Sequence, residues 1–189
     1  MDGIRWLSAE SHFDLGYWVV FARGIGPEEL LDRMGVEAGS VRRLDRFDAG
    51  DLMDELDTAV LRAGESCGWA FAVAEGGPGG TNSSQALSSA SAGSEAVEFW
   101  RTVNQDKMFA YARNGEEVFR CEPGQVHPLP TGGFSPDSVS AASLGLPGTA
   151  ADTAIGSERD ALTVAEEVFG LNLPKDEVLE GVLLSAPLP

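Results

Sequence analysis

The sequence predicts a single α+β domain, in which helices pack against an antiparallel or mixed sheet of about 5–7 strands. Two observations carry this prediction. Short aromatic and β-branched runs, typical of strands, alternate with segments that begin at helix-capping residues. The length of 189 residues, of which 43% are hydrophobic, suits one compact domain with an ordinary core. We therefore expect residues 1–189 to fold as one unit.

The strand and helix signals follow one another along the chain. Strands are predicted over residues 17–23, 41–46, 58–63, 69–74, 95–103, 108–113 and 116–121, the second of them exposed or at an edge. Helices are predicted over residues 27–34, 48–56, 82–92, 135–144, 157–169 and 174–183. Their ends are set by Pro27 at a first helical position, by Asp48, Asn82 and Ser157 as caps, and by Gly170 as a terminator.

One hairpin and two loops complete the predicted organisation. Asn114 and Gly115 form the preferred pair for a two-residue turn. A turn of that length places Tyr111 opposite Val118 and Phe109 opposite Arg120. A glycine-rich stretch at about 75–83 is predicted to be a flexible loop, and a second loop, rich in proline and glycine, is predicted at about 122–134.

The charge of the chain limits its partners. Thirty acidic residues face thirteen Lys and Arg, which gives a net charge of -17. Nucleic acids and anionic membranes bind proteins whose surfaces carry a surplus of Lys and Arg. This chain has the opposite surplus, so the sequence predicts neither as a partner. A basic protein, in contrast, is attracted by such a surface. The N-terminus lacks the basic and apolar regions of a signal peptide, and two cysteines are too few for a disulfide framework, so we predict a cytoplasmic protein.

The densest acidic cluster supplies the candidate partner-binding residues. They are Asp48, Asp51, Asp54, Glu55 and Asp57. Because most of them fall on a predicted helix, they lack the loop with a central glycine and a final bidentate acid that calcium requires. No metal and no cofactor is predicted. The cluster is either an acidic surface that binds a basic partner or an ordinary solvated helix face.

A second group of residues is a candidate ligand pocket. Trp69, Trp100 and Arg101 combine flat apolar rings with a hydrogen-bonding cation, although tryptophans of this kind more often pack in a core. The segment Gly64–Gly68 also matches the nucleophile elbow of hydrolases, with Ser66 as its serine. That motif requires a helix after the serine, whereas a strand is predicted here. We therefore interpret residues 64–68 as a hairpin turn and predict no catalytic residue.

Several segments taken together resemble a known family. They are residues 17–30, 68–73, 96–104 and 109–112, of which the run Trp100–Asn104 is the most characteristic. They resemble an uncharacterised family of small acidic actinobacterial proteins, a domain of unknown function, over roughly residues 15–125. The resemblance implies no activity, and no functional residue is transferred from it.

Three classes of function remain open. The first is a protein-binding module of immunity or regulatory type, whose acidic surface meets a basic partner. The second is a small enzyme or small-molecule-binding protein with a pocket near Trp69, Trp100 and Arg101. The third is a structural or sensory accessory protein. A deep pocket with converging polar groups favours the second class, and a flat acidic face favours the first.

Overall fold

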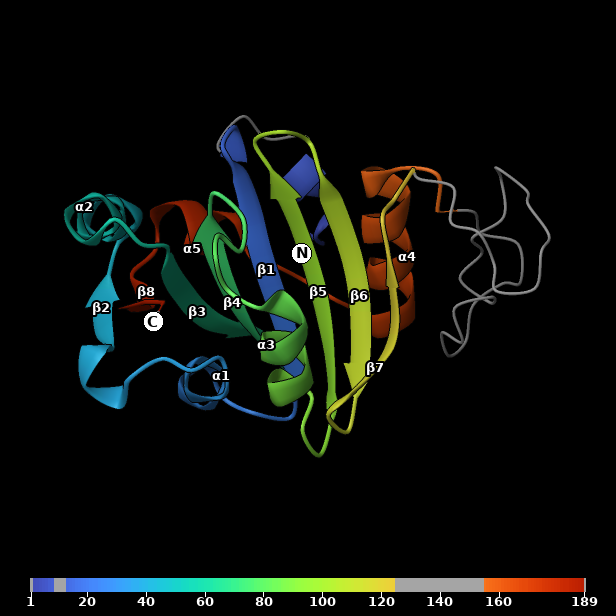
Figure 1. Cartoon of the computed structure of the whole chain (residues 1–189), viewed down its shortest axis with the longest axis horizontal. Coiled ribbons are helices and arrows are strands. Elements are labelled where there is room, and N and C mark those ends of the chain that lie inside the picture. The colour runs from blue at the N-terminus through green and yellow to red at the C-terminus, as the bar shows by residue number, and fades with distance from the viewer. Residues whose placement is uncertain (1, 9–12, 125–154, 189) are drawn as a thin grey trace.

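The computed structural model describes residues 2–8, 13–124 and 155–188. It confirms the α+β class, with an eight-stranded antiparallel sheet in the order β2-β8-β3-β4-β1-β5-β6-β7 (Figure 1). The strands are β1 (Gly16–Arg23), β2 (Arg42–Leu44), β3 (Val60–Ser66), β4 (Trp69–Glu75), β5 (Glu95–Thr102), β6 (Lys107–Arg113), β7 (Glu116–Cys121) and β8 (Leu183–Pro187). The helices are η1 (Arg5–Ser8), α1 (Pro27–Arg33), η3 (Ala38–Ser40), α2 (Arg46–Leu56), α3 (Ser83–Ala90), α4 (Glu158–Phe169) and α5 (Lys175–Glu180).

The two faces of the sheet differ in side-chain size. We call one the aromatic face, because it carries the residues Tyr17, Phe21, Trp69, Phe71, Phe99, Phe109, Tyr111 and Phe119. Helices η1, α4 and α5 pack on it. We call the other the alanine face, because it carries Ala22, Ala70, Ala72, Ala74, Ala96, Ala110 and Ala112. Helices α1 and α3 cover this face, and its small side chains leave room for them (Figure 1).

Local sequence signals set most helix ends as expected. The Asn82 side chain accepts a hydrogen bond from the backbone N–H of Gln85, and Ser157 does the same for Asp160. Gly170 ends α4 in the left-handed region, with φ of 66°. The predicted cap of α2 is wrong, because Asp45 rather than Asp48 holds that position and accepts a hydrogen bond from the Asp48 N–H. Asp48 lies in the first turn, where its charge favours the positive end of the helix.

The last predicted helix, over residues 174–183, extends three residues too far. Helix α5 ends at Glu180, and residues from Leu183 onward form β8, which lies between β2 and β3. Leu183 packs on the aromatic face while Leu184 and Ala186 pack on the alanine face. This alternation is a strand pattern, but five residues are too short for it to outweigh the helical spacing before it. The missed strand raises the total from seven to eight.

The β6–β7 hairpin confirms the turn and corrects the register. Asn114 and Gly115 both have positive φ, 54° and 84°, as a two-residue turn of this type requires. The ladder then shifts between Tyr111 and Ala112, so Tyr111 pairs with Phe119 and not with Val118. Phe109 likewise pairs with Cys121 and not with Arg120. The irregularity leaves Val118 at the surface and brings the Phe119 ring onto the aromatic face.

The structure describes the first of the two predicted loops and only the start of the second. Part of the stretch 75–83 is tied to the sheet, since the Gly76 N–H donates to the Gly16 carbonyl. Its flexibility stays a prediction. Most of the predicted loop at 122–134, and the whole of the predicted helix at 135–144, lie outside the described residues. None of the helices that the structure describes is long and apolar enough to cross a membrane.

Candidate functional site

A pocket of about 370 Å³ lies beneath helix α2, which forms one wall. The ends of β3 and β4 and a residue of α5 form the remaining walls and the floor. Its lining mixes apolar side chains with three carboxylates and two guanidinium groups. The volume falls in the range of small-ligand sites. The sequence does not predict a pocket at this place, although two of its lining residues, Asp51 and Asp54, belong to the predicted acidic cluster.

The rim of the pocket is an amphipathic stripe on α2. Phe47 is 84% exposed, an unusual position for a large aromatic side chain. Asp51 and Asp54 follow it at spacings of four and seven residues, which places all three on one side of the helix. Both aspartates are exposed. The mouth of the pocket therefore offers an aromatic ring beside two carboxylates.

The floor of the pocket contains a buried arginine. Arg62 is only 6% exposed, and its two terminal nitrogens donate to the carbonyls of Val178 and Gly181. These carbonyls lie at the C-terminal end of α5, where the helix dipole is negative and favours a cation. Burial lowers the pKa of Arg62. The Arg62 guanidinium thus links β3 to the C-terminal end of α5 through these two hydrogen bonds.

One wall of the pocket is an ion pair braced by a ring. Arg46 Nε, at the start of α2, lies 2.7 Å from Glu75 Oε1, at the end of β4. The Arg46 guanidinium also lies 5.9 Å from the centre of the Phe13 ring. At that distance a cation is attracted to the face of an aromatic ring. Phe13 and Arg46 therefore fix each other at the pocket wall.

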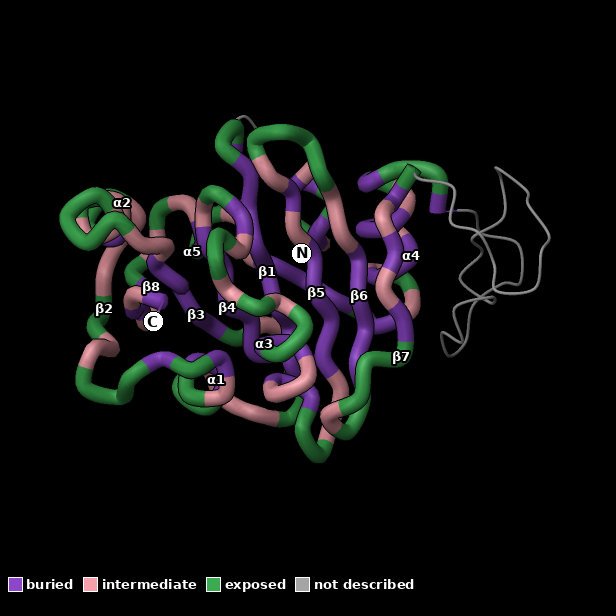
Figure 2. Tube along the Cα trace, viewed as in Figure 1, coloured by how far each residue is buried: buried purple, intermediate pink, exposed green. Residues whose placement is uncertain are grey.

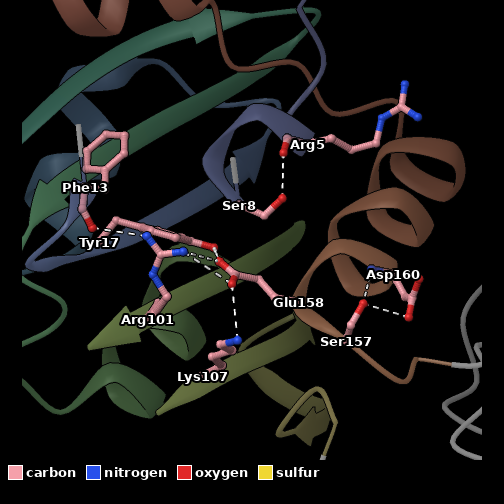
Figure 3. Close-up of polar contacts among 9 residues, drawn as sticks. All are labelled: Arg5, Ser8, Phe13, Tyr17, Arg101, Lys107, Ser157, Glu158 and Asp160. Carbon is pink, nitrogen blue, oxygen red and sulfur yellow. Dashed lines mark hydrogen bonds and ion pairs between the residues drawn. The ribbon is translucent and has the colours of Figure 1, made fainter. Parts of the chain in front are cut away.

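A network of polar side chains binds the backbone carbonyl of Phe13 (Figure 3). Arg101 Nη2 donates to the Phe13 carbonyl at 3.1 Å, and Arg101 Nη1 lies 3.3 Å from Glu158 Oε1. The Tyr17 hydroxyl donates to the same Glu158 oxygen at 2.8 Å, and Lys107 Nζ lies 3.5 Å from the other oxygen. Glu158 is the first residue of α4 and is 9% exposed. Through this network α4 is connected to the pocket wall.

The network follows one row across the sheet. Tyr17 pairs with Glu75 on one side and with Arg101 on the other, and Arg101 pairs with Lys107. Directly paired residues point to the same face, so four polar side chains lie side by side there. Burial and the Glu158 charge raise the pKa of Tyr17 well above its usual value. The tyrosine therefore acts as a hydrogen-bond donor. Only the strand register reveals this row, which explains why sequence reasoning missed it.

A second buried carboxylate lies on the alanine face. Glu98 is fully buried, and Trp18 Nε1 donates to its Oε1 at 2.7 Å. Arg120 Nη1 lies 3.2 Å from Oε2 without the alignment of a hydrogen bond. Burial raises the pKa of Glu98 to about 7, against the opposing charge of Arg120 and the Trp18 hydrogen bond. Glu98 is therefore a carboxyl group whose charge changes near neutral pH.

The predicted acidic cluster divides in the structure. All five residues are exposed: Asp48, Asp51, Asp54, Glu55 and Asp57. Asp51 and Asp54 line the pocket, whereas the other three do not. Asp57 ends α2 in the left-handed region, with φ of 50°. The structure thus selects two acids of the five as part of a concave site.

The alternative residues do not come together. Trp69 pairs with Arg23 and Arg101 pairs with Tyr17, at opposite ends of β1. Six residues of strand separate these pairs, roughly 20 Å. Trp100 lies on the alanine face, away from both. The pocket expected near these three residues is therefore not formed by them.

The nucleophile elbow match is a hairpin turn, as expected. Cys67 and Gly68 join β3 to β4 with positive φ, 53° and 78°, and no helix follows Ser66. Asn172 Nδ2 donates to the Ser66 hydroxyl at 2.7 Å.

Burial raises the pKa of Cys121 to about 12, which keeps this thiol protonated. Both histidines of the chain lie outside the described residues. Among the residues with described positions, no group of three or more His, Cys, Asp or Glu could hold a metal.

The fold and the pocket together define a small α+β protein with an acidic-rimmed concave site. The chain belongs to DUF6461, a family of unknown function, whose profile matches residues 2–182. The expectation that the chain belongs to a family of unknown function is confirmed, over more of the chain than the roughly 15–125 expected. Comparison with curated proteins and with solved structures finds no match.

Proposed function

We propose that this protein is a protein-binding module of immunity or regulatory type, which holds a basic side chain of its partner in the pocket beneath α2. One observation carries the proposal. Phe47, the most exposed large apolar residue described, stands at the pocket mouth beside Asp51 and Asp54. A Lys or Arg side chain entering there meets two carboxylates and the face of a ring, which attract a cation by two different mechanisms.

The charges around the pocket support a cationic guest. The exposed charged groups of the lining are mainly carboxylates, whereas Arg62 is buried and bound to carbonyls, and Arg46 is paired with Glu75. The net charge of -17 adds a long-range attraction for a basic protein. Such a field speeds association, and salt weakens it, because exposed charges are screened beyond about 8 Å at physiological ionic strength.

The pocket itself favours a second candidate, a small cationic ligand. Its volume of about 370 Å³ suffices for a small molecule, and the floor is partly apolar through Val60 and Val73. This candidate differs from the pocket expected near Trp69, Trp100 and Arg101. A cytoplasmic location and a place among small acidic actinobacterial proteins also belong to the proposal; the thirty acidic residues against thirteen Lys and Arg support the acidic character.

Side-chain analogues test the proposal without knowledge of the partner. We expect n-butylammonium and propylguanidinium, titrated into the isotope-labelled protein, to shift the amide signals of residues 46–54 in a saturable way, with millimolar affinity. Butyrate has the same size and the opposite charge, and it should not shift them. Failure of both cations to move these signals would contradict the proposal.

Matched variants locate the effect. Asp51→Asn and Asp54→Asn keep side-chain size and remove charge at the pocket rim, so each should weaken cation binding by about threefold to tenfold. Glu55→Gln removes one charge from the same helix outside the pocket lining and should change the affinity little. Equal weakening by all three variants would show a diffuse charge effect and no pocket.

A further inference from the structure

Two more exposed apolar side chains lie at the same end of the sheet as the pocket. Leu15 is 63% exposed and Val103 is 58% exposed. Gly16 and Thr102 form the last pair of the β1–β5 ladder at this end. Leu15 comes directly before that pair and Val103 directly after it, so the antiparallel register, continued by one position, brings the two residues opposite each other. Figure 2 shows the segments just outside these ends of β1 and β5 as exposed, next to the buried strands.

This end of the sheet is continuous with the pocket wall. Glu75, at the end of β4, belongs to the wall, and it pairs with Tyr17 of the neighbouring β1. Strand β5 follows β1 directly in the sheet. Because neighbouring strands lie about 4.8 Å apart, only about 10 Å separate β4 from β5. The pocket and the Leu15–Val103 pair can therefore contact a single partner.

The surroundings of the pair carry the same charge as the pocket rim. Asp14 precedes Leu15, and Asp106 lies in the turn that follows Val103. Both aspartates are exposed. Single exposed apolar residues are common on protein surfaces. Two adjacent ones beside a pocket, framed by acids, instead match the usual composition of an interface, with an apolar centre and a polar rim.

We propose that the partner's contact surface extends from the pocket beneath α2 to Leu15 and Val103. This inference rests on the proposed function and adds to it the chemistry of the partner. The partner carries a basic side chain for the pocket and an apolar side chain about 10–15 Å away for the Leu15–Val103 pair. In an extended segment, which advances about 3.3 Å per residue, this distance corresponds to three to five residues.

Short synthetic peptides test the spacing. Each capped peptide contains one Lys and one Leu, separated by one, three, five or seven Gly or Ser residues, and a matched series replaces Leu with Ser. We expect peptides with the intermediate spacings to bind roughly fivefold more tightly than their Ser counterparts, because a partly buried Leu gains apolar contact. The amide signals of residues 14–16 and 102–104 should shift only with the Leu series.

Surface variants separate this inference from the proposed function. Leu15→Ser and Val103→Ser should remove the gain from Leu and leave the affinity for n-butylammonium unchanged. Val118→Ser is the matched control, since Val118 is 47% exposed and lies on β7, at the far edge of the sheet. If butylammonium binds but Leu gives no gain at any spacing, the extended surface is wrong and the pocket proposal stands. If neither n-butylammonium nor propylguanidinium binds, the proposed function is wrong as well as the extended surface.

Discussion

Glu98 provides a direct test of how burial controls charge in this protein. Its carboxyl group is fully buried on the alanine face, with Trp18 as hydrogen-bond donor and Arg120 as the nearest cation. The perturbation is Glu98→Gln, which keeps the shape of the side chain and removes its titration. The acceptor for the Trp18 N–H remains as an amide oxygen.

The expected effect follows from the pKa difference. Folding raises the pKa of Glu98 from 4.5 to about 7, so the folded state binds its proton more tightly than the unfolded state. The resulting stabilisation is complete below pH 4.5 and is lost as the pH rises through 7. The full difference corresponds to about 3 kcal/mol, of which roughly 2.5 kcal/mol disappears between pH 5 and pH 8. For a domain of this size, that loss lowers the Tm by roughly 5–10 °C.

The assay compares two proteins, so that other titrating groups cancel. Urea unfolding of the wild type and of Glu98→Gln at half-unit steps from pH 5 to pH 8 gives the difference in free energy of unfolding. We expect the difference to move by roughly 2.5 kcal/mol in favour of the variant as the pH rises. Arg120→Gln should shift this transition to higher pH, because the Arg120 charge lowers the pKa of Glu98. A difference independent of pH would refute the reasoning.

Three further outcomes are expected. Tyr17→Phe removes a buried hydrogen bond to a charged group and should lower the free energy of unfolding by about 1.5–3 kcal/mol in urea titrations; an unchanged value would show that Arg101 and Lys107 alone satisfy Glu158. Gly64→Ala places a Cβ 2.6 Å from Phe71 Cζ and should destabilise by about 1–3 kcal/mol, whereas Gly50→Ala, in α2 with open space around it, should stabilise by about 0.5–1 kcal/mol. Residues 76–83 should exchange their amide protons among the fastest of the described chain, except Gly76, whose N–H is bonded to the Gly16 carbonyl; slow exchange of the others in deuterium-labelling measurements would contradict this expectation.

Local signals predicted the fold where the determining residues are close in sequence. Asn82, Ser157 and Gly170 act on helix ends within four residues, and Asn114 with Gly115 determines its own turn. Errors arose where tertiary pairing decides. Strand β8 forms by pairing with β2 on one side and β3 on the other, and both are distant in sequence. The β6–β7 register depends on a bulge that pairs Phe119 with Tyr111. Neither condition is visible in a short window of sequence.

The candidate site was predictable only in part, for the same reason. Asp51 and Asp54 stood out as acids at helical spacing, and the structure places them at the pocket mouth. Nothing near Arg62 in the sequence indicates that it reaches the end of α5, 116 residues later. Trp100 and Arg101 are neighbours in sequence and lie on opposite faces of the sheet, so their proximity along the chain was misleading.

The bonds of Arg62 have a consequence for synthesis on the ribosome. The Val178 and Gly181 carbonyls that Arg62 binds follow β3 by more than 100 residues, as does strand β8, which pairs with the edge of β3 that faces away from β4. Until residues 175–187 emerge, β3 exposes an unpaired backbone edge, which can pair with another chain. The pocket floor forms at the same late moment, because Val178 is part of it. Nascent chains of this protein should therefore be open to aggregation until residues 175–187 have emerged.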